Sequence, residues 1–164
     1  MPNNPAQAAA DAVRQSILDA YRKAVQSGAL PDGAPENFDV SEPRDKNHGD
    51  LAANFAMLWA KPLGMPPRKI AEIVVGLVDK LGDIEDMTIA GPGFVNVTLS
   101  GAWYAKTLRA IDEAGDDYGK TQGNAGRKMQ VEFVSANPTG PMHLGNARGG
   151  VLGDTLASIL QWTG

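Results

Sequence analysis

The sequence has 164 residues, a length that suits one domain, or one small domain and part of another. Hydrophobic residues make up 43% of it, enough for a globular core, and the formal net charge is −4. Proteins that bind nucleic acid through many phosphates are usually basic, so any RNA contact is expected either to be local and led by shape or to depend on parts that are absent from this sequence. The absence of cysteine excludes disulfides and thiolate metal sites, and no metal site is predicted.

The sequence gives no sign of a membrane or secreted protein. It has no apolar run long enough for a transmembrane helix. The segment Met1-Pro-Asn-Asn-Pro5 lacks the basic start and apolar core of a signal peptide. We therefore expect a cytoplasmic protein that makes no membrane contact.

The first part of the chain predicts a long helix and a short strand. Apolar residues recur every three or four positions in residues 6–27, which is typical of an amphipathic helix, and Gly28 is expected to end it. Residues 38–41 alternate apolar and polar side chains, as a strand does.

Two more helices are predicted after a polar loop. The first covers residues 51–61, with Asp50 or Asn47 as its cap and Pro62 as its stop. The second begins at Pro66-Pro67, because proline suits the first turn of a helix. Its apolar stripe comprises Ile70, Ile73, Val74, Leu77, Val78 and Leu81.

Residues 87–90 and 94–99 predict two strands joined by the turn Gly91-Pro-Gly93. Side chains alternate across a strand, so Phe94 and Asn96 share one face. The other face is more apolar and is expected to be buried, which leaves Phe94 and Asn96 on the outer face; its residues are Val95, Val97 and Leu99. Ser100 is expected to cap a helix whose apolar residues are Trp103, Leu108 and Ile111.

Residues 116–127 form a glycine-rich linker, so the first domain (residues 1–115) is predicted to be a small α+β domain with an antiparallel sheet and helices. Residues 128–164 predict the start of a Rossmann-like α/β domain: a strand at 129–134, a Pro/Gly loop, and a helix from about His143 to Trp162 that Gly164 closes.

The start of this last helix is a candidate phosphate site. Unpaired N–H groups and the helix dipole favour anions there. His143 and Asn146 lie three residues apart, so both project from the first turn and each can donate a hydrogen bond. Gly145, Gly149 and Gly153 form a bare ridge along the same helix. Two explanations of this ridge are possible: a ligand that lies close to the helix, which we expect at Gly145, and close packing of the helix, which we expect at Gly153. Either explanation suits Gly149.

The segment His143-Leu-Gly-Asn146 resembles the His-x-Gly-His signature of class I aminoacyl-tRNA synthetases. The longer string from Glu132 to Gly149, Glu-Phe-Val-Ser-Ala-Asn-Pro-Thr-Gly-Pro-x-His-x-Gly-x-x-Arg-Gly, is more specific and resembles the arginyl-tRNA synthetases. That resemblance implies catalytic, ATP-binding roles for His143 and Asn146 and an ATP contact at Gly145. Asn146 departs from the commoner histidine, so it keeps a donor but cannot carry charge.

The resemblance also implies an arginine site. Ser135 and Asn137 would contact the amino and carboxylate groups of arginine, and Glu132 would recognise its guanidinium, which matches a carboxylate with two parallel hydrogen bonds. Two simpler interpretations stay open. Glu132 suits an outward-facing strand carboxylate, and His143 suits a residue that merely caps its helix.

The first domain resembles the additional amino-terminal domain of the same family, through Glu42-Pro-Arg-Asp-Lys-Asn-His-Gly-Asp50, Asn54 and Ile89-Ala-Gly-Pro-Gly-Phe-Val-Asn96. In the family this domain contacts the D-loop of tRNA, which implies tRNA-binding roles for Phe94 and Asn96. An aromatic ring can stack on a base, and a carboxamide can read a base edge.

The resemblance implies an arginine–tRNA ligase that uses ATP, with Mg²⁺ accompanying ATP and no tightly bound cofactor, and that has arginine and tRNA(Arg) as partners. The second class I signature is missing from the sequence, so we expect a catalytic domain that is incomplete, inactive alone, and prone to self-association. A stand-alone RNA-binding module and another nucleotidyltransferase with a His-x-Gly-His signature are the alternatives.

Overall fold

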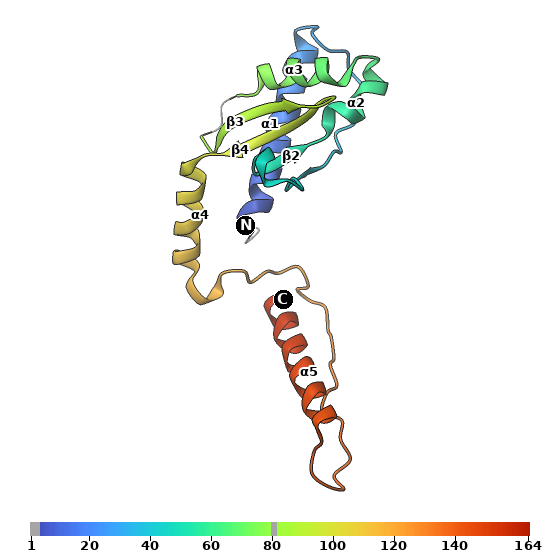
Figure 1. Ribbon diagram of the computed structural model, residues 1–164, viewed down its shortest axis with the longest axis vertical. Helices are drawn as coiled ribbons and strands as arrows, with labels where there is room; N and C mark the ends of the chain where they lie inside the picture. Colours follow the sequence, from blue (N-terminus) through green and yellow to red (C-terminus); the bar gives the residue numbers. More distant parts are fainter. Residues whose placement is uncertain (1–3, 80–81) are drawn as a thin grey trace. The chain divides into compact units, whose positions relative to one another are not determined.

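A computed structural model describes residues 4–79 and 82–164 of the chain. The chain divides into two compact units, Asn4–Glu113 and a second that includes Ala114–Gly164 (Figure 1). The interpretation of these units as functional domains joined by a linker stays a prediction.

The first helix, α1, spans Pro5–Gln26, close to its predicted bounds. The Asn4 side chain caps it by accepting hydrogen bonds from the backbone N–H groups of Ala6 and Gln7, at 3.1 and 3.2 Å. Gly28 follows the helix with a φ of 74°, a conformation that glycine adopts without steric cost.

Four antiparallel strands form one sheet in the order β1-β2-β4-β3. Their bounds are Val40–Ser41 (β1), Leu51–Ala53 (β2), Ile84–Ala90 (β3) and Phe94–Leu99 (β4). In the register of the two central strands Leu51 pairs with Val97. The small antiparallel sheet with helices, predicted from the sequence, is confirmed, although the predicted strand at 38–41 is limited to its last two residues.

The predicted helix at 51–61 is wrong at its start. Residues Leu51–Ala53 are β2, and the helix α2 spans Phe55–Leu63. Strand β2 pairs with both β1 and β4, so backbone hydrogen bonds to distant segments outweigh the local helical pattern. Pro62 lies inside the last turn instead of stopping the helix, because a proline there removes only one backbone donor.

Neither Asp50 nor Asn47 caps α2. Asn54 occupies the N-cap position, and its side chain accepts a hydrogen bond from Asp39 N at 3.0 Å. Asp50 instead accepts hydrogen bonds from Leu99 N at 2.8 Å and from the Tyr104 hydroxyl at 2.6 Å. Its carboxylate therefore joins the β1–β2 connection to β4 and to the helix that follows β4.

Helices α3, Pro67–Leu77, and α4, Gly101–Ala114, complete the first unit. Ile70 and Val74 of the α3 stripe are buried, whereas Leu81 lies outside the described residues. Ser100 caps α4 as predicted, since its hydroxyl accepts a hydrogen bond from Trp103 N at 3.3 Å. Of the apolar residues on α4, Trp103 is partly buried against the core, whereas Leu108 is 66% exposed.

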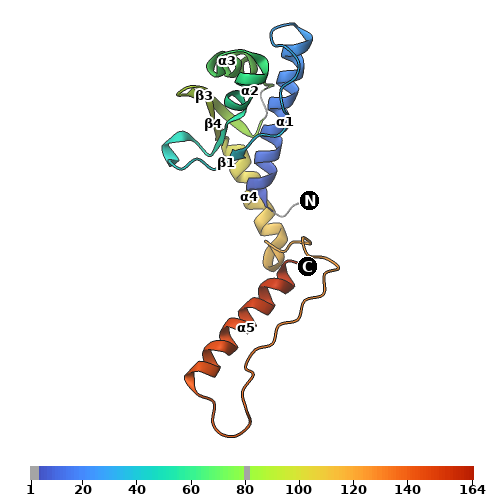
Figure 2. The ribbon, with the colours of Figure 1, turned by 90° about the vertical axis from the view of Figure 1, so that its right-hand side faces the viewer.

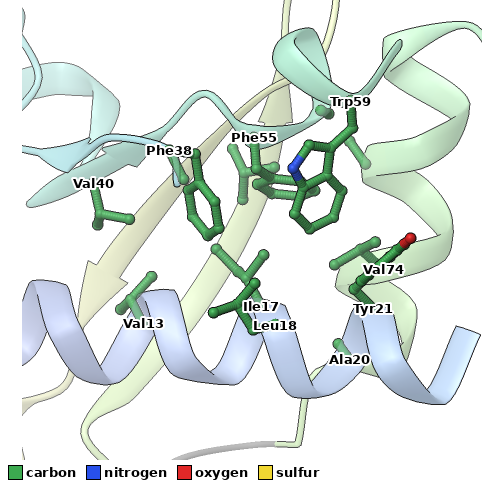
Figure 3. Packing of buried hydrophobic residues seen from close by; sticks show 14 of the residues in the cluster. Val13, Ile17, Leu18, Ala20, Tyr21, Phe38, Val40, Phe55, Trp59 and Val74 are labelled. Atoms are coloured by element: carbon green, nitrogen blue, oxygen red, sulfur yellow. The ribbon is translucent and has the colours of Figure 1, made fainter. Parts of the chain in front are cut away.

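The hydrophobic core lies between one face of the sheet and the helices α1, α2 and α3. Figure 3 shows α1 side chains such as Ile17 directed toward Phe38, Phe55 and Trp59. The Trp59 indole N–H donates to Pro35 O at 2.8 Å, so this large ring is buried without losing its hydrogen bond. On β4, Val95, Val97 and Leu99 are buried, as predicted from alternation.

The second unit contains one long helix, α5, Leu144–Trp162, which confirms the predicted helix. The predicted strand at 129–134 is not formed. Those residues run beside α5 without a strand partner in the described chain (Figures 1 and 2). A strand needs a neighbour for its backbone hydrogen bonds, and the positive φ of Val134, 55°, also breaks the extended conformation.

Candidate functional site

The start of α5 is held by its own side chains. His143 occupies the N-cap position, and its Nδ1 accepts a hydrogen bond from Gly145 N at 3.1 Å. The Asn146 Oδ1 accepts a hydrogen bond from His143 N at 3.1 Å. His143 therefore caps its helix through Nδ1, as the simpler interpretation expected. The two hydrogen bonds bring His143, Gly145 and Asn146 together.

These contacts leave one donor on each side chain. With Nδ1 acting as an acceptor, a neutral His143 carries its proton on Nε2, and Asn146 keeps its Nδ2 hydrogens. In the described chain no hydrogen bond involves His143 Nε2 or Asn146 Nδ2. His143 is exposed and Asn146 is half-buried. Two hydrogen-bond donors thus lie beside the positive end of a helix dipole, an arrangement that suits an anion.

The predicted arginine-binding residues lie on the segment before α5. The Ser135 hydroxyl donates a hydrogen bond to Glu132 Oε1 at 2.7 Å. Glu132, Ser135 and Asn137 are all exposed. Among the hydrogen bonds of the described residues, none joins these three to His143 or Asn146, so the structure assembles the two halves of the predicted site separately.

The glycine ridge divides into two kinds of position. A Cβ on Gly153 would lie 2.1 Å from Phe133 Cβ, so the packing explanation is confirmed there. A Cβ on Gly149 would meet nothing within 4 Å, and one on Gly145 would meet the His143 ring at 3.0 Å. Gly150, which the pattern did not single out, packs against Val134, where a Cβ would lie 2.9 Å from Cγ2.

The outer face of the sheet carries the predicted tRNA-binding residues. Phe94 is 43% exposed at the start of β4, and Asn96 is half-buried two residues on. Asn96 pairs with Thr88 of β3 and Ala52 of β2, two small neighbours on the same face. An exposed aromatic residue and a carboxamide two positions further on thus lie on one strand of the four-stranded sheet.

The sequence pattern missed two contacts. One is the Asp50–Tyr104 hydrogen bond, which raises the pKa of Tyr104 above its ordinary value, with burial and the carboxylate charge acting in the same direction. The other joins Arg68, at the start of α3, to the carbonyl oxygen of Gly91 at 3.1 Å. Both link residues more than twenty positions apart, so no local spacing indicates them.

Comparison with known proteins gives the family. Residues 9–99, more than half of the chain, match the family described as "Arginyl tRNA synthetase N terminal domain". The arginine–tRNA ligase of Caldanaerobacter subterraneus subsp. tengcongensis is 48% identical over 162 residues, which cover 98% of this chain. The chain belongs to the arginyl-tRNA synthetase family. The same ligase from Rhizobium meliloti (strain 1021) is 54% identical over 130 residues, or 77% of this chain.

This chain spans only part of its arginyl-tRNA synthetase relatives: 29% of the length of the first and 22% of the second. A crystal structure of arginyl-tRNA synthetase from Plasmodium falciparum aligns with 93% of this chain and 28% of its own, with a TM-score of 0.57 and 16% identity. That likeness supports the fold of the family. None of the helices in the described ranges has the length and hydropathy needed to cross a membrane.

Proposed function

We propose that this chain is part of an arginine–tRNA ligase, an enzyme that activates arginine with ATP and then esterifies it to the 3′ end of tRNA(Arg). The observation that carries this proposal is the family match over residues 9–99 together with the identity to bacterial arginine–tRNA ligases along nearly the whole chain. The string from Glu132 to Gly149 is the part that would take part in the chemistry.

His143, Gly145 and Asn146 would bind ATP, and the two side chains would act as catalytic groups. His143 Nε2 and Asn146 Nδ2 supply donors for phosphate oxygens, and Gly145 would contact ATP beside them at the helix start. Mg²⁺ would arrive with ATP as part of the substrate. The hydrogen bonds within the first turn hold the donors in place before ATP binds.

Glu132, Ser135 and Asn137 would bind arginine. The Glu132 carboxylate can pair with a guanidinium, and its present partner, the Ser135 hydroxyl, orients one of its oxygens. The site would close only when further parts of the enzyme cover these exposed side chains. We therefore expect the 164-residue chain by itself to be inactive.

Phe94 and Asn96 would contact the tRNA. The chain has a formal net charge of −4, so contact through stacking and a base edge suits it better than broad binding to phosphates. The side chains of β4 that face the core fix the strand, which leaves Phe94 and Asn96 available on the opposite face.

The exposed apolar side chains of α5 support a further part of the proposal. Val151, Leu152, Leu156 and Ile159 lie on one side of the helix and are exposed. Such a face tends to find a partner, so we propose that the isolated chain self-associates through it. A chain that stays strictly monomeric in light scattering at high concentration would contradict this. We propose that the enzyme acts in the cytoplasm, where arginine, ATP and tRNA are present.

The direct test is ATP–pyrophosphate exchange by the proposed full-length ligase, measured with each amino acid in the presence of tRNA(Arg). We expect exchange with arginine and none above background with the other amino acids. The 164-residue chain is the matched comparison and is expected to give no exchange. Exchange driven by a different amino acid would overturn the proposal.

A further inference from the structure

The turn between β3 and β4 is held by the start of α3. Gly93 has a φ of 146°, and a Cβ on it would lie 2.9 Å from both the carbonyl carbon and the Cβ of Pro67. The Arg68 Nη1 donates a hydrogen bond to Gly91 O at 3.1 Å. The turn therefore contacts α3 both through close packing and through a charged hydrogen bond.

Arg68 is itself oriented by its own helix. Its Nε lies 3.3 Å from Glu72 Oε1, one turn further along α3. This ion pair leaves Nη1 directed to the turn. Pro66-Pro67 precedes Arg68 and makes the backbone at this point stiff, so the guanidinium extends from a well-defined base.

Phe94 depends on this turn more than the rest of β4 does. It follows Gly93 directly and pairs with Ala90, the residue on the other side of the turn. Gly93 N donates to Ala90 O at 3.2 Å, which closes the turn. Phe94 is 43% exposed and lies outside the buried core, so the direction of its side chain depends on the backbone of the turn.

We propose that Arg68 is a positioning residue for tRNA binding: by holding the Gly91 carbonyl against α3, it sets the direction in which Phe94 meets a base. This inference rests on the proposed tRNA contact at Phe94. Stacking needs a ring at the correct height and tilt, and a turn that moves freely would lose part of that contact. A direct contact between Arg68 and tRNA phosphate is the competing explanation.

A double-mutant cycle separates the two explanations. Binding of tRNA(Arg) to the chain is measured by fluorescence anisotropy at low salt, with thermal unfolding as the check on folding. We expect Phe94→Ala to weaken affinity about tenfold, as for a lost stacking contact. Arg68→Ala is expected to weaken it about three- to fivefold alone, and less than twofold when Phe94 is already alanine.

Three further variants sharpen the cycle. Arg68→Lys keeps the charge and a donor, so it should restore part of the affinity. Gly93→Ala perturbs the same contact from the other side and should resemble Arg68→Ala, because its Cβ would press on Pro67. Lys69→Ala removes a neighbouring exposed cation, and we expect it to change affinity less than twofold.

The outcomes are distinguishable. If Arg68→Ala weakens tRNA affinity equally in the presence and absence of the Phe94 ring, the positioning role is overturned. The same holds if Lys69→Ala weakens affinity as much as Arg68→Ala does. Either result would favour a charge contact with tRNA phosphate. No loss from Arg68→Ala alongside a full loss from Phe94→Ala would overturn it while the tRNA contact stands. If Phe94→Ala binds as the unaltered chain does, the proposed contact itself fails, and the positioning role with it.

Discussion

The two compact units differ in how completely their apolar side chains are covered. In Asn4–Glu113 the helices α1, α2 and α3 and one face of the sheet enclose a continuous core. In Ala114–Gly164 the one buried residue among those described is Gly153, while apolar side chains of α5 are exposed. A helix gains most of its stability from burying one face. The first unit therefore supplies most of the stability, and the second carries most of the residues proposed for chemistry.

The largest expected difference between the units comes from removing a large side chain. Trp59 is 0% exposed, and Trp59→Ala should lower the free energy of unfolding by about 3–5 kcal/mol, because it leaves a cavity and an unpaired Pro35 carbonyl. Ile159 is 55% exposed, and Ile159→Ala should change the free energy of unfolding by less than about 0.5 kcal/mol. Urea unfolding followed by circular dichroism measures both.

Equal losses from the two variants would show that α5 is as well packed as the first unit. Because Trp59→Ala can prevent folding altogether, Val95→Ala is a smaller probe of the same core, with an expected loss of about 1–3 kcal/mol. A negligible loss from Val95→Ala would contradict close packing of the sheet against the helices of the first unit.

A pair of glycine variants tests the packing inside the second unit. Gly153→Ala should detach Phe133 from α5 at a cost of about 1–3 kcal/mol, because the new Cβ would overlap the Phe133 side chain. In Gly149→Ala the new Cβ has no neighbouring atom within 4 Å, so the substitution should stabilise α5 by up to about 1 kcal/mol. Amide hydrogen exchange of α5 measures both, and faster exchange in both variants, or in neither, would contradict this packing.

The smallest expected effect concerns the contact between Asp50 and Tyr104. Tyr104→Phe removes this exposed hydrogen bond and should cost about 0.5–1 kcal/mol at pH 7. The raised pKa of Tyr104 means that its contribution is present below the ordinary value of about 10 and is lost as the pH rises through the raised value. Unfolding measured between pH 8 and about 11 should show a decline in stability that the variant lacks.

Helices with strong periodicity were predictable, and contacts between distant segments were not. The bounds of α1 and α5 follow from the spacing of apolar residues and from their caps, which are local features. Strand β2 has only three residues, and it exists because β1 and β4 pair with it, so its own sequence pattern was misleading. The segment 129–134 has a strand-like pattern but has no partner strand among the described residues.

In the candidate site, too, local features were predictable and contacts between distant segments were not. The outer position of Phe94 and Asn96 could be predicted from alternation along β4, because the opposite face is apolar. The hydrogen bonds between His143, Gly145 and Asn146 lie within one helical turn and agree with their spacing. The contact of Arg68 with Gly91 spans 23 positions and depends on how α3 packs against the sheet, which no motif encodes.

Steady-state aminoacylation by the proposed full-length ligase tests most directly whether the two units carry separate parts of one arginine–tRNA ligase. Phe94→Ala should raise the KM for tRNA(Arg) about tenfold and leave the KM for arginine unchanged, because it removes a stacking contact. Glu132→Gln should raise the KM for arginine at least tenfold and leave that for tRNA unchanged, because it removes the guanidinium partner. We expect each variant to raise only the KM of its own substrate. A variant that changes neither KM, or that changes the KM of the other substrate, would contradict separate roles for the two units.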